Sequence, residues 1–365
     1  MKDDITGMES TRAPEMKGPL PKRIAKVALK ALSVLFSILL VIVAALCAVM
    51  WVLAKGPSPT AQRLFVMTVK ETSAIGFLAN MYLSEAEIDR IMSLKEPEDE
   101  YIEATDPSMI TLPSYIPSIS ANPVGDPSGG QREEADVEDV ELHEVIGNGY
   151  RGYMLIVHDP KRLFVGTPNT YGGRGLTLQQ MVNNTGAVAG INAGGFDDPG
   201  GSGTGGIPDG IVICEGKLIW GAGTGRASVI GFDSDGLLHV GVMTPSEAIN
   251  LGLQWAVSFG PTLISNGVPQ PLRASSGINP RTAIGQRADG AVLLLVIDGR
   301  QIESLGATLS DLIEVFLDFG AVNAANLDGG SSTLMIFDGE IVNSCAALSG
   351  PRPLPTAFLV SAVTG

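Results

Sequence analysis

Two Asp-Gly pairs lie in the segment NLDGGSSTLMIFDGEIVN, residues 326–343, and their settings differ. Asp338-Gly339 stands between two short apolar runs, as in a tight β-hairpin. Asp328 follows an apolar run and precedes Gly-Gly-Ser-Ser, which is more glycine and hydroxyl than a two-residue turn requires. Asp338 is therefore predicted to serve a turn, whereas Asp328 is a carboxylate whose setting indicates a chemical role.

A second glycine-rich stretch, GINAGGFDDPGGSGTGGIPDG, covers residues 190–210. Because glycine has no Cβ, a Gly-Gly pair lets the backbone approach a ligand and adopt positive φ, and several N–H groups can then converge on an anion. Long loops without secondary structure are usually functional or disordered. We expect this loop to bind phosphate or sugar. A nucleoside triphosphate is not indicated, because the pattern Gly-x-x-x-x-Gly-Lys-Ser/Thr is absent.

Arg281 stands in NPRTAIG, directly before a predicted strand and after a proline that fixes the approach. From there a guanidinium could clasp phosphate or carboxylate in a two-point contact. Pairing with a surface carboxylate is an equally good interpretation of the spacing. Asp298 and Glu303 are further carboxylates, although Asp298-Gly299-Arg300 can simply turn the chain.

Metal-ligand spacing is absent from the sequence. The three histidines, His143, His158 and His239, are scattered, and no Cys-x-x-Cys occurs. A zinc hydrolase is therefore disfavoured, and we expect neither a metal nor another cofactor. Cys214 and Cys345 could pair, but their spacing does not decide it.

The elements that must position these residues include two similar segments, Thr177 to Phe196 and Thr308 to Gly330. Each opens with a capping threonine and an amphipathic run, stops at a glycine, and continues into a strand that ends near an Asn and a Gly-Gly pair. We therefore predict two helix–strand–Gly-Gly corners that lie near one another and shape one cleft.

Short apolar runs punctuated by glycine fill the rest of the chain after about residue 142. Turns are predicted at Glu215-Gly216, Asp235-Gly236, Asp289-Gly290 and Asp338-Gly339. The pattern predicts one α+β domain, rich in glycine, with mixed or antiparallel sheets and two or three helices.

Five motifs in order, GINAGGF, GPTLISNG, NPRTAIG, LDGGSST and the late Arg352-Pro353, resemble the phosphodiester glycosidase family over about residues 145 to 365. The family is typified by the enzyme that uncovers mannose 6-phosphate by removing N-acetylglucosamine, and bacterial members are often labelled exopolysaccharide biosynthesis proteins. The sequence departs from the family pattern in two places. A third glycine often expected after LDGG is Ser331, and GGF is followed by Asp197 rather than a second aromatic residue.

The resemblance implies cleavage of a bond between an anomeric carbon and phosphate, with oxocarbenium character developing on the sugar. A carboxylate near the anomeric carbon then matters more than a strong acid, and a cation must hold the phosphate. The catalytic residues it implies are Asp328 as this carboxylate, Arg281 as the phosphate clamp and Asp197 as a second carboxylate. The substrate-binding residues it implies are Asn192, Gly194, Gly195, Asp198, Thr282, Gly329, Gly330, Ser331 and Arg352.

A membrane anchor is predicted before this domain. Residues 31–54 contain no charged side chain, enough to cross a hydrocarbon core of roughly 30 Å. A cleavable signal peptide is the closest competitor, but its apolar region is normally shorter and followed by small residues. Lysines and arginines before the span place the N-terminus in the cytoplasm and the domain outside, by the positive-inside rule.

The expected organisation therefore has five parts. A helical stalk should have Thr60 as one N-cap and a capping box of Ser84 with Glu87. Residues 95–144 contain two basic and fourteen acidic residues, and their composition is typical of a flexible tether. The predicted parts are a basic cytoplasmic segment (1–30), the membrane anchor (31–54), the stalk (55–94), the acidic Pro-rich linker (95–141) and the glycosidase domain (142–365).

These observations favour a membrane-anchored, extracytoplasmic glycosidase acting on sugar-1-phosphodiesters of cell-surface glycans, such as teichoic-acid-like or capsular polymers. The expected partners are the glycan and the membrane, and protein partners are left open. A nucleic-acid partner is disfavoured because the domain lacks clustered Lys and Arg. The alternative is a non-catalytic glycan-binding or envelope-assembly module on the same fold. A metal-dependent phosphodiesterase would need more histidines than this domain has.

Overall fold

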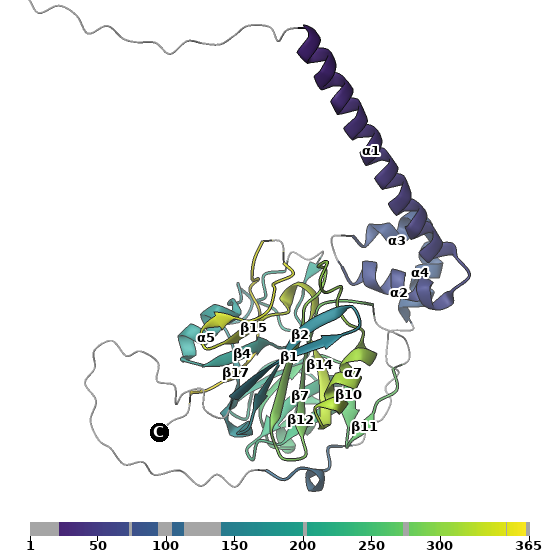
Figure 1. The fold of residues 1–365 in the computed structure, drawn as a ribbon. Helices are drawn as coiled ribbons and strands as arrows, with labels where there is room; N and C mark the ends of the chain where they lie inside the picture. Colours follow the sequence, from purple (N-terminus) through teal and green to yellow (C-terminus); the bar gives the residue numbers. More distant parts are fainter. Residues whose placement is uncertain are drawn as a thin grey trace, which may run out of the picture. The chain divides into compact units, whose positions relative to one another are not determined.

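The computed structural model describes residues 22–72, 75–93, 104–112, 140–199, 203–272, 277–347 and 349–362 (Figure 1). The chain forms two units, Met1–Lys55 and Gly56–Gly365. The predicted basic segment falls largely on residues 1–21, which lie outside the described residues. The predicted linker likewise lies outside them, except for residues 104–112 and Val140 and Glu141.

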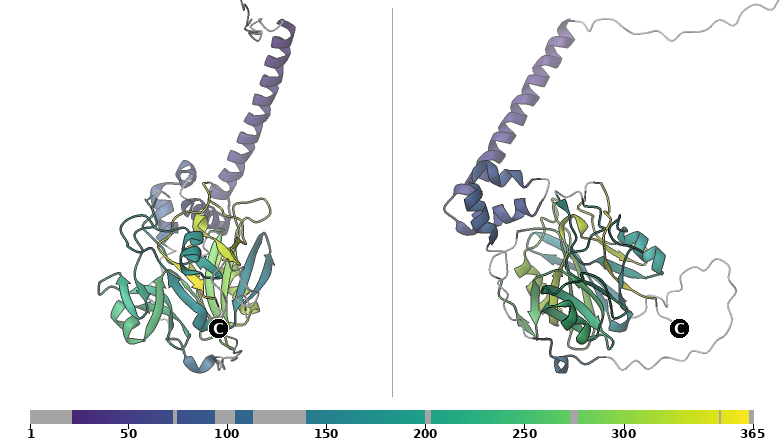
Figure 2. Two further views of the ribbon diagram at one scale, coloured as in Figure 1. Left: turned by 90° about the vertical axis from the view of Figure 1, so that its left-hand side faces the viewer. Right: turned by 180° about the vertical axis from the view of Figure 1, so that it is seen from behind.

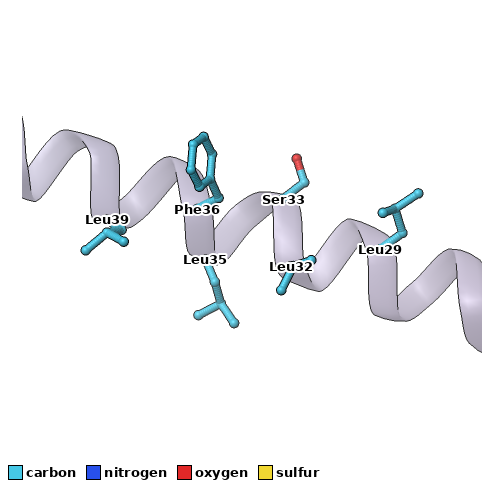
Figure 3. Close-up of a pocket in the computed structure, with 6 residues that line it drawn as sticks. All are labelled: Leu29, Leu32, Ser33, Leu35, Phe36 and Leu39. Atoms are coloured by element: carbon cyan, nitrogen blue, oxygen red, sulfur yellow. The ribbon is translucent and has the colours of Figure 1, made fainter.

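Helix α1, Lys22–Lys55, is the described part of the first unit. Its stretch Leu29–Lys55, 27 residues with a mean hydropathy of 3.0, is long and apolar enough to cross a membrane, a test that a signal sequence near an N-terminus also passes. Figure 3 shows leucine and phenylalanine side chains pointing to opposite sides of this helix. The shallow hollow that these side chains line lies along a single helix. Its lining is apolar except for the hydroxyl of Ser33, so it is not a candidate substrate site.

The second unit begins with three short helices, α2 (Pro59–Lys70), α3 (Phe77–Tyr82) and α4 (Glu85–Met92). The predicted capping box of Ser84 and Glu87 at α4 is confirmed. The prediction of Thr60 as an N-cap is wrong, because Ser58 accepts the Ala61 N–H and Pro59 occupies the first helical position, which suits a residue without an N–H.

Seventeen strands in the described residues form three sheets, and neighbouring strands pair antiparallel. The seven-stranded sheet has the order β1 (Val140–Gly147), β2 (Tyr150–Val157), β13 (Val292–Ile297), β12 (Arg281–Arg287), β14 (Ala321–Leu327), β10 (Thr262–Ser265), β11 (Val268–Pro269). The second sheet has the order β16 (Glu340–Ile341), β15 (Met335–Phe337), β4 (Ala189–Asn192), β17 (Ala357–Val360), β3 (Leu163–Gly166). The third has the order β6 (Lys217–Trp220), β5 (Val212–Cys214), β9 (Leu253–Ser258), β7 (Ala227–Asp233), β8 (Leu238–Met243).

The main core lies between the seven-stranded sheet and the other two sheets. It joins apolar side chains of all three sheets, among them Leu294, Phe358 and Phe232. Strand β13 is buried along its whole length, which explains its uninterrupted apolar sequence VLLLVI. Figure 2 shows the strands of the third sheet in teal and green.

Three helices complete this α+β domain, as the sequence predicts: α5 (Leu178–Thr185), α6 (Pro245–Asn250) and α7 (Leu309–Asp318). α7 covers the outer face of the seven-stranded sheet through Leu312 and Phe316, and α5 packs on the second sheet through Met181. The predicted threonine caps at Thr177 and Thr308 are confirmed, and each makes a capping box.

The glycine stops are confirmed as well. Gly186 and Gly320 have φ of 71° and 79°, the left-handed conformation that favours glycine. After these stops the chain enters β4 and β14, which belong to different sheets. The predicted hairpin turns at Glu215, Asp235, Asp289 and Asp338 also join consecutive strands.

Residues 104–112 of the predicted linker lie against the domain. The Asp106 N–H donates to the Asn266 side chain at 2.8 Å, and the Thr111 N–H donates to the Ala288 carbonyl at 2.7 Å. Ile110 is 7% exposed and packs with Leu237 and Val322. This part of the acidic segment is therefore an ordered strap across the domain.

Candidate functional site

The two predicted corners meet at Asp328. Its backbone N–H donates to the Ala193 carbonyl at 2.9 Å, and its carbonyl accepts a hydrogen bond from the Asn192 side-chain amide. Ala193 follows β4 and Asp328 follows β14, so the ends of two sheets are joined here. The prediction that the corners lie together is confirmed.

Asn192 and Thr282 hold this junction together from inside. Both are fully buried. The Asn192 Oδ1 accepts hydrogen bonds from the Thr282 hydroxyl at 2.8 Å and from the Leu334 N–H at 3.1 Å. The sequence resemblance placed both residues in contact with substrate, but in this structure they position the backbone of Asp328.

The Asp328 carboxylate is strongly perturbed. Burial raises its pKa from 3.8 to about 7, and the nearby Asp198 charge acts in the same direction. Hydrogen bonds from the Ser332 hydroxyl and the Gly329 N–H, and the charge of Arg352, oppose this rise. The Oδ2 atom is inaccessible to solvent and has no hydrogen-bond partner. An unpartnered buried carboxylate oxygen is costly to maintain, and strongly perturbed groups of this kind cluster at functional sites.

Arg352 and Asp198 form the neighbouring pair. Arg352 Nη2 lies 2.7 Å from Asp198 Oδ1, and its guanidinium lies 4.7 Å from the ring centre of Phe196. The Arg352 hydrogen bond, followed by the Gly203 N–H, lowers the pKa of Asp198 in spite of partial burial. The site thus contains two carboxylates whose pKa values are moved apart, the arrangement that separates permanently charged groups from proton-transfer groups.

The glycines of the first corner have a packing explanation. The Gly194 N–H donates to the Thr356 hydroxyl at 2.9 Å, and the Gly195 N–H donates to the Ser258 carbonyl at 3.2 Å. A Cβ on Gly195 would lie 2.9 Å from the Phe259 ring. The expectation that these two N–H groups converge on an anion is therefore wrong in this structure, because both are used within the protein.

The glycine turn after Asp328 is also closely packed, and an arginine lies over it. Gly330 has φ of 61°, and its N–H donates to the Pro280 carbonyl at 2.9 Å. Arg300 lies over this turn: its Nη1 donates to the Ser331 hydroxyl at 3.2 Å, and a Cβ on Gly330 would lie 3.3 Å from its Nη2. Arg300 is exposed. The turn therefore presents an accessible cation beside the Asp328 corner.

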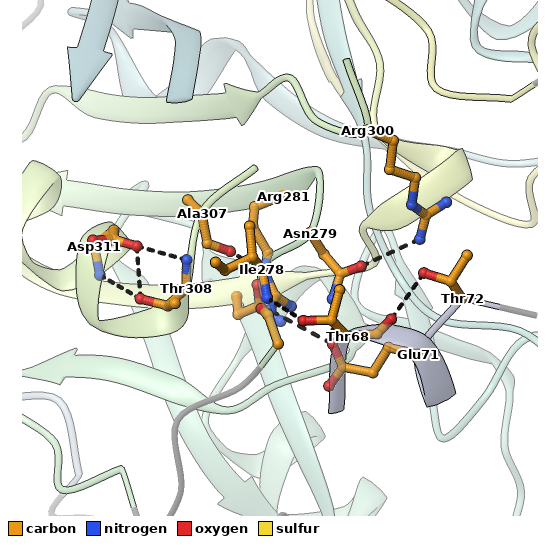
Figure 4. A network of polar contacts seen from close by, with 12 residues as sticks. Thr68, Glu71, Thr72, Ile278, Asn279, Arg281, Arg300, Ala307, Thr308 and Asp311 are labelled. Atoms are coloured by element: carbon orange, nitrogen blue, oxygen red, sulfur yellow. Dashed lines mark hydrogen bonds and ion pairs between the residues drawn. The ribbon is translucent and has the colours of Figure 1, made fainter. Parts of the chain in front are cut away.

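Arg281 lies in a closed environment (Figure 4). Its Nε donates to the Ala307 carbonyl at 3.1 Å, its Nη2 donates to the Gly277 carbonyl at 2.5 Å, and Nη2 lies 3.7 Å from Glu71 Oε2. The residue is 8% exposed. The interpretation as a substrate clamp is corrected here, since the guanidinium is engaged by groups of the protein itself.

Asp197, the predicted second carboxylate, is exposed on the glycine-rich loop. Its backbone N–H donates to the Ile207 carbonyl at 2.9 Å. Burial raises the pKa of Asp209, and the charge of Asp197 adds to the rise. Asp209 thus joins Asp197 on this loop, although its sequence context, Asp209-Gly210, resembles an ordinary turn.

Sequence reasoning missed Ser332, Arg300 and Asp209. Ser332 lies in the Gly-Gly-Ser-Ser run that marked Asp328, so the excess hydroxyl was the available signal. Arg300 has φ of 60°, as a turn residue would, and its second role depends on a turn 30 positions away. Cys214 and Cys345, which the sequence left as a possible pair, are not joined by a disulfide.

The fold and site define an antiparallel α+β domain in which a buried carboxylate of raised pKa lies beside arginines at the junction of two sheets. Residues 185–361 match the sequence model of the phosphodiester glycosidase family. This match confirms the family resemblance drawn from the sequence, and the structure confirms the fold class.

Two curated relatives each match about half of this chain. The chain is 31% identical over 195 residues to the SPbeta prophage-derived uncharacterized protein YomE of Bacillus subtilis (strain 168), covering 51% of this chain and 29% of that protein. It is 26% identical over 216 residues to the N-acetylglucosamine-1-phosphodiester alpha-N-acetylglucosaminidase of Bos taurus, covering 53% of this chain and 40% of that enzyme. The chain thus spans less than half the length of both proteins.

A solved structure supports the fold. The catalytic domain of zebrafish N-acetylglucosamine-1-phosphodiester alpha-N-acetylglucosaminidase, auto-inhibited by pro-peptide, matches with a TM-score of 0.51 and 21% identity. The match covers 61% of this chain and 82% of that domain. At 21% identity this comparison shows a similar arrangement of helices and strands, and no more than that.

Proposed function

We propose that this protein is a glycosidase that hydrolyses sugar-1-phosphodiesters, with Asp328 as the central proton-transfer group. The observation that carries the proposal is the buried, unpartnered Asp328 Oδ2 in a family whose members include enzymes named for this reaction. A carboxyl with a pKa near 7 can exchange a proton efficiently at neutral pH.

The proposed reaction breaks the bond between the anomeric carbon and the phosphate oxygen. Asp328, in its ionised form, takes a proton from water as the water oxygen attacks the anomeric carbon. The bonding electrons leave with the phosphate oxygen, which departs as a phosphomonoester, and the proton passes from Asp328 to solvent. A phosphate monoester anion is a good leaving group, so a strong general acid is not required.

Arg300 is the proposed contact for the phosphate. It is exposed, always charged, and fixed over the glycine turn by Ser331, and a guanidinium suits the two-point recognition of phosphate oxygens. Arg352 is assigned a different task. Its bond to Asp198 keeps that carboxylate ionised, and its charge limits the rise in the Asp328 pKa.

The remaining predicted site residues either contact the sugar or position other residues of the site in this proposal. Asp197 and Asp198 are proposed to accept hydrogen bonds from the sugar hydroxyls. Gly329 and Gly330 form the turn that lets Pro280 and Arg300 approach closely, and Ser331 anchors Arg300. Asn192 and Thr282 position the backbone of Asp328. Arg281 stabilises the neighbouring segments through the carbonyls of Gly277 and Ala307.

The substrate is proposed to be a cell-surface glycan joined through phosphodiesters, met outside the cytoplasm. Support for this placement comes from the apolar stretch Leu29–Lys55 and from the lysines and arginines that precede it in the sequence. In this proposal α1 is an uncleaved anchor with its N-terminus in the cytoplasm, followed by a short stalk and an acidic linker.

The test is incubation of the full chain in detergent with a panel of hexose and N-acetylhexosamine 1-(methyl phosphates), with release of free sugar as the readout. We expect turnover of at least one compound by the wild type and none by Asp328→Asn. In water labelled with oxygen-18, the label should enter the sugar. Label in the phosphate would show P–O cleavage instead, and sugar binding without any turnover would favour a glycan-binding module.

A further inference from the structure

Helix α2 lies against the segment that leads into β12. The Ile278 N–H donates to the Thr68 hydroxyl at 3.0 Å. A Cβ on Gly277 would lie 2.5 Å from the backbone nitrogen of Thr68, so the two backbones touch and a side chain at position 277 would separate them. α2 lies outside residues 185–361, the part of the chain that matches the family.

Glu71, directly after α2, makes further polar contacts at this junction. Its Oε2 accepts a hydrogen bond from Asn279 Nδ2 at 2.5 Å and lies 3.7 Å from Arg281 Nη2 (Figure 4). The side chains of Glu71 and Arg281 are 11% and 10% exposed. Two charges this deeply buried are tolerated only when they are paired and hydrogen-bonded, so the docking of α2 is specific.

Asn279 connects Glu71 to Arg300. Its Nδ2 donates to Glu71, and its Oδ1 accepts from Arg300 Nη2 at 3.3 Å. Because a carboxylate only accepts and a guanidinium only donates, the two charged neighbours determine the orientation of this amide. The backbone of Asn279 is fixed as well, since its N–H and carbonyl both bond to Ala307, at 3.2 and 2.9 Å.

Arg300 depends on this connection for its direction. Its backbone lies in an exposed loop, and its guanidinium has two side-chain anchors, the Asn279 amide on one side and the Ser331 hydroxyl on the other. Ser331 belongs to the turn that follows Asp328. A continuous chain of contacts therefore runs from Glu71 through Asn279 and Arg300 to the candidate catalytic corner.

We infer that Glu71 is a positioning residue of the site: through Asn279 it aims Arg300 at the phosphate of the substrate, so that helix α2 completes the phosphate-binding side. This inference rests on the proposed function, since it gives Arg300 a phosphodiester to bind. It also means that the family-matching domain alone lacks one part of its substrate site.

The test measures KM and kcat for the methyl phosphodiester turned over fastest by the wild-type full chain. Because the hydrogen bond that is lost joins a charged group, Glu71→Ala is expected to raise KM about tenfold while kcat changes less than about twofold. Glu71→Gln, which keeps an acceptor for Asn279, should remain close to wild type in KM. Glu314→Ala, which removes an exposed carboxylate from α7, is the matched control and should change neither constant.

A double-mutant cycle separates positioning from general support. If Glu71 acts through Arg300, Glu71→Ala should add little to the KM of Arg300→Ala, whereas independent effects would multiply. Melting temperatures of all variants are compared, and Asn279→Ala replaces Glu71→Ala in the cycle if the latter fails to fold. An unchanged KM, a multiplying effect or a rise in kcat/KM would each overturn the inference; in the last case α2 would obstruct the site rather than complete it.

Failure of the inference can be told from failure of the proposed function. Wild-type turnover with an unaffected Glu71→Ala variant removes the positioning role alone. If the wild type turns over no compound, the proposed function fails, and the dissociation constant for N-acetylglucosamine 1-phosphate by calorimetry then replaces KM. Equal dissociation constants for wild type and Glu71→Ala, or no binding to either, would overturn the inference.

Discussion

Replacing Asp328 by asparagine should stabilise the protein while abolishing its activity, and the stabilisation should depend on pH. The carboxyl has a pKa of about 7 in the folded chain against an ordinary value of 3.8. The folded state therefore holds this proton more tightly than the unfolded state. The free energy of unfolding is therefore unaffected by this group below about pH 4. It falls as the pH rises from about 4 to about 7 and is lowest above the folded-state pKa of about 7.

The magnitude follows from the two values. A rise of about three pKa units corresponds to about 4 kcal/mol of unfolding free energy lost at alkaline pH, at 1.36 kcal/mol per unit. At pH 5 somewhat under half of this penalty is already present, so the loss between pH 5 and pH 8 is about 2–3 kcal/mol. Asparagine does not ionise, and any cost of its unpartnered amide is the same at both pH values and cancels from the comparison.

The assay is thermal unfolding of the full chain in detergent, followed by the fluorescence of its tryptophans. The advantage in melting temperature of Asp328→Asn over wild type should be larger at pH 8 than at pH 5 by about 5–10 °C. Asp338→Asn is the control, because Asp338 is exposed in a hairpin turn at φ of 47°, which asparagine tolerates. An equal advantage at both pH values would show that the Asp328 carboxylate is not destabilised by burial, and the reasoning would fail.

Three further predictions concern the same corner. The kcat/KM of the wild type should rise with pH to a plateau, with a midpoint near the Asp328 pKa of about 7, since the ionised form acts as the base; a rate that falls through this range would make Asp328 an acid. Arg352→Gln should move that midpoint to higher pH, because the Arg352 charge lowers the Asp328 pKa, while Arg352→Lys should keep it; equal midpoints for all three proteins would contradict the assignment. Asn192→Ala should lower the unfolding free energy by about 2–4 kcal/mol at all pH values, because three buried hydrogen-bonding groups lose their partner, and urea titration at pH 5 and pH 8 would measure it.

Local sequence patterns predicted most of the helix starts, helix ends and hairpin turns. The threonine caps of α5 and α7, the glycine stops at Gly186 and Gly320, and the Asp-Gly hairpins each depend on a few neighbouring residues, and the structure agrees with them. The meeting of the two corners followed from their similarity in sequence. The exception at Thr60 is also local, since Pro59 competes for the start of α2 and Ser58 then becomes the cap.

The candidate site was predicted less well because burial is decided by distant partners. Arg281 precedes a strand in a position that could serve a cleft, but Glu71, 210 positions earlier, and the carbonyls of Gly277 and Ala307 surround it. Gly195 looks like part of an anion-binding loop, yet its missing Cβ is explained by the Phe259 ring. Glu71 and Phe259 are distant in sequence from the residues that they contact, so the residues next to Arg281 and Gly195 in the chain do not predict these contacts.

The two Asp-Gly pairs show how the structure separates residues that a short motif treats alike. Asp338 occupies the left-handed conformation of a tight turn and keeps its side chain in solvent, so the turn itself explains it. Asp328 directly follows a buried strand at the junction of two sheets, and its Oδ2 has no hydrogen-bond partner. Simple selection for stability would replace such a carboxylate, because asparagine could make the same backbone contacts without the charge. Its presence beside Arg352, Asp198 and a glycine turn is therefore best explained by a ligand that uses the unpartnered oxygen.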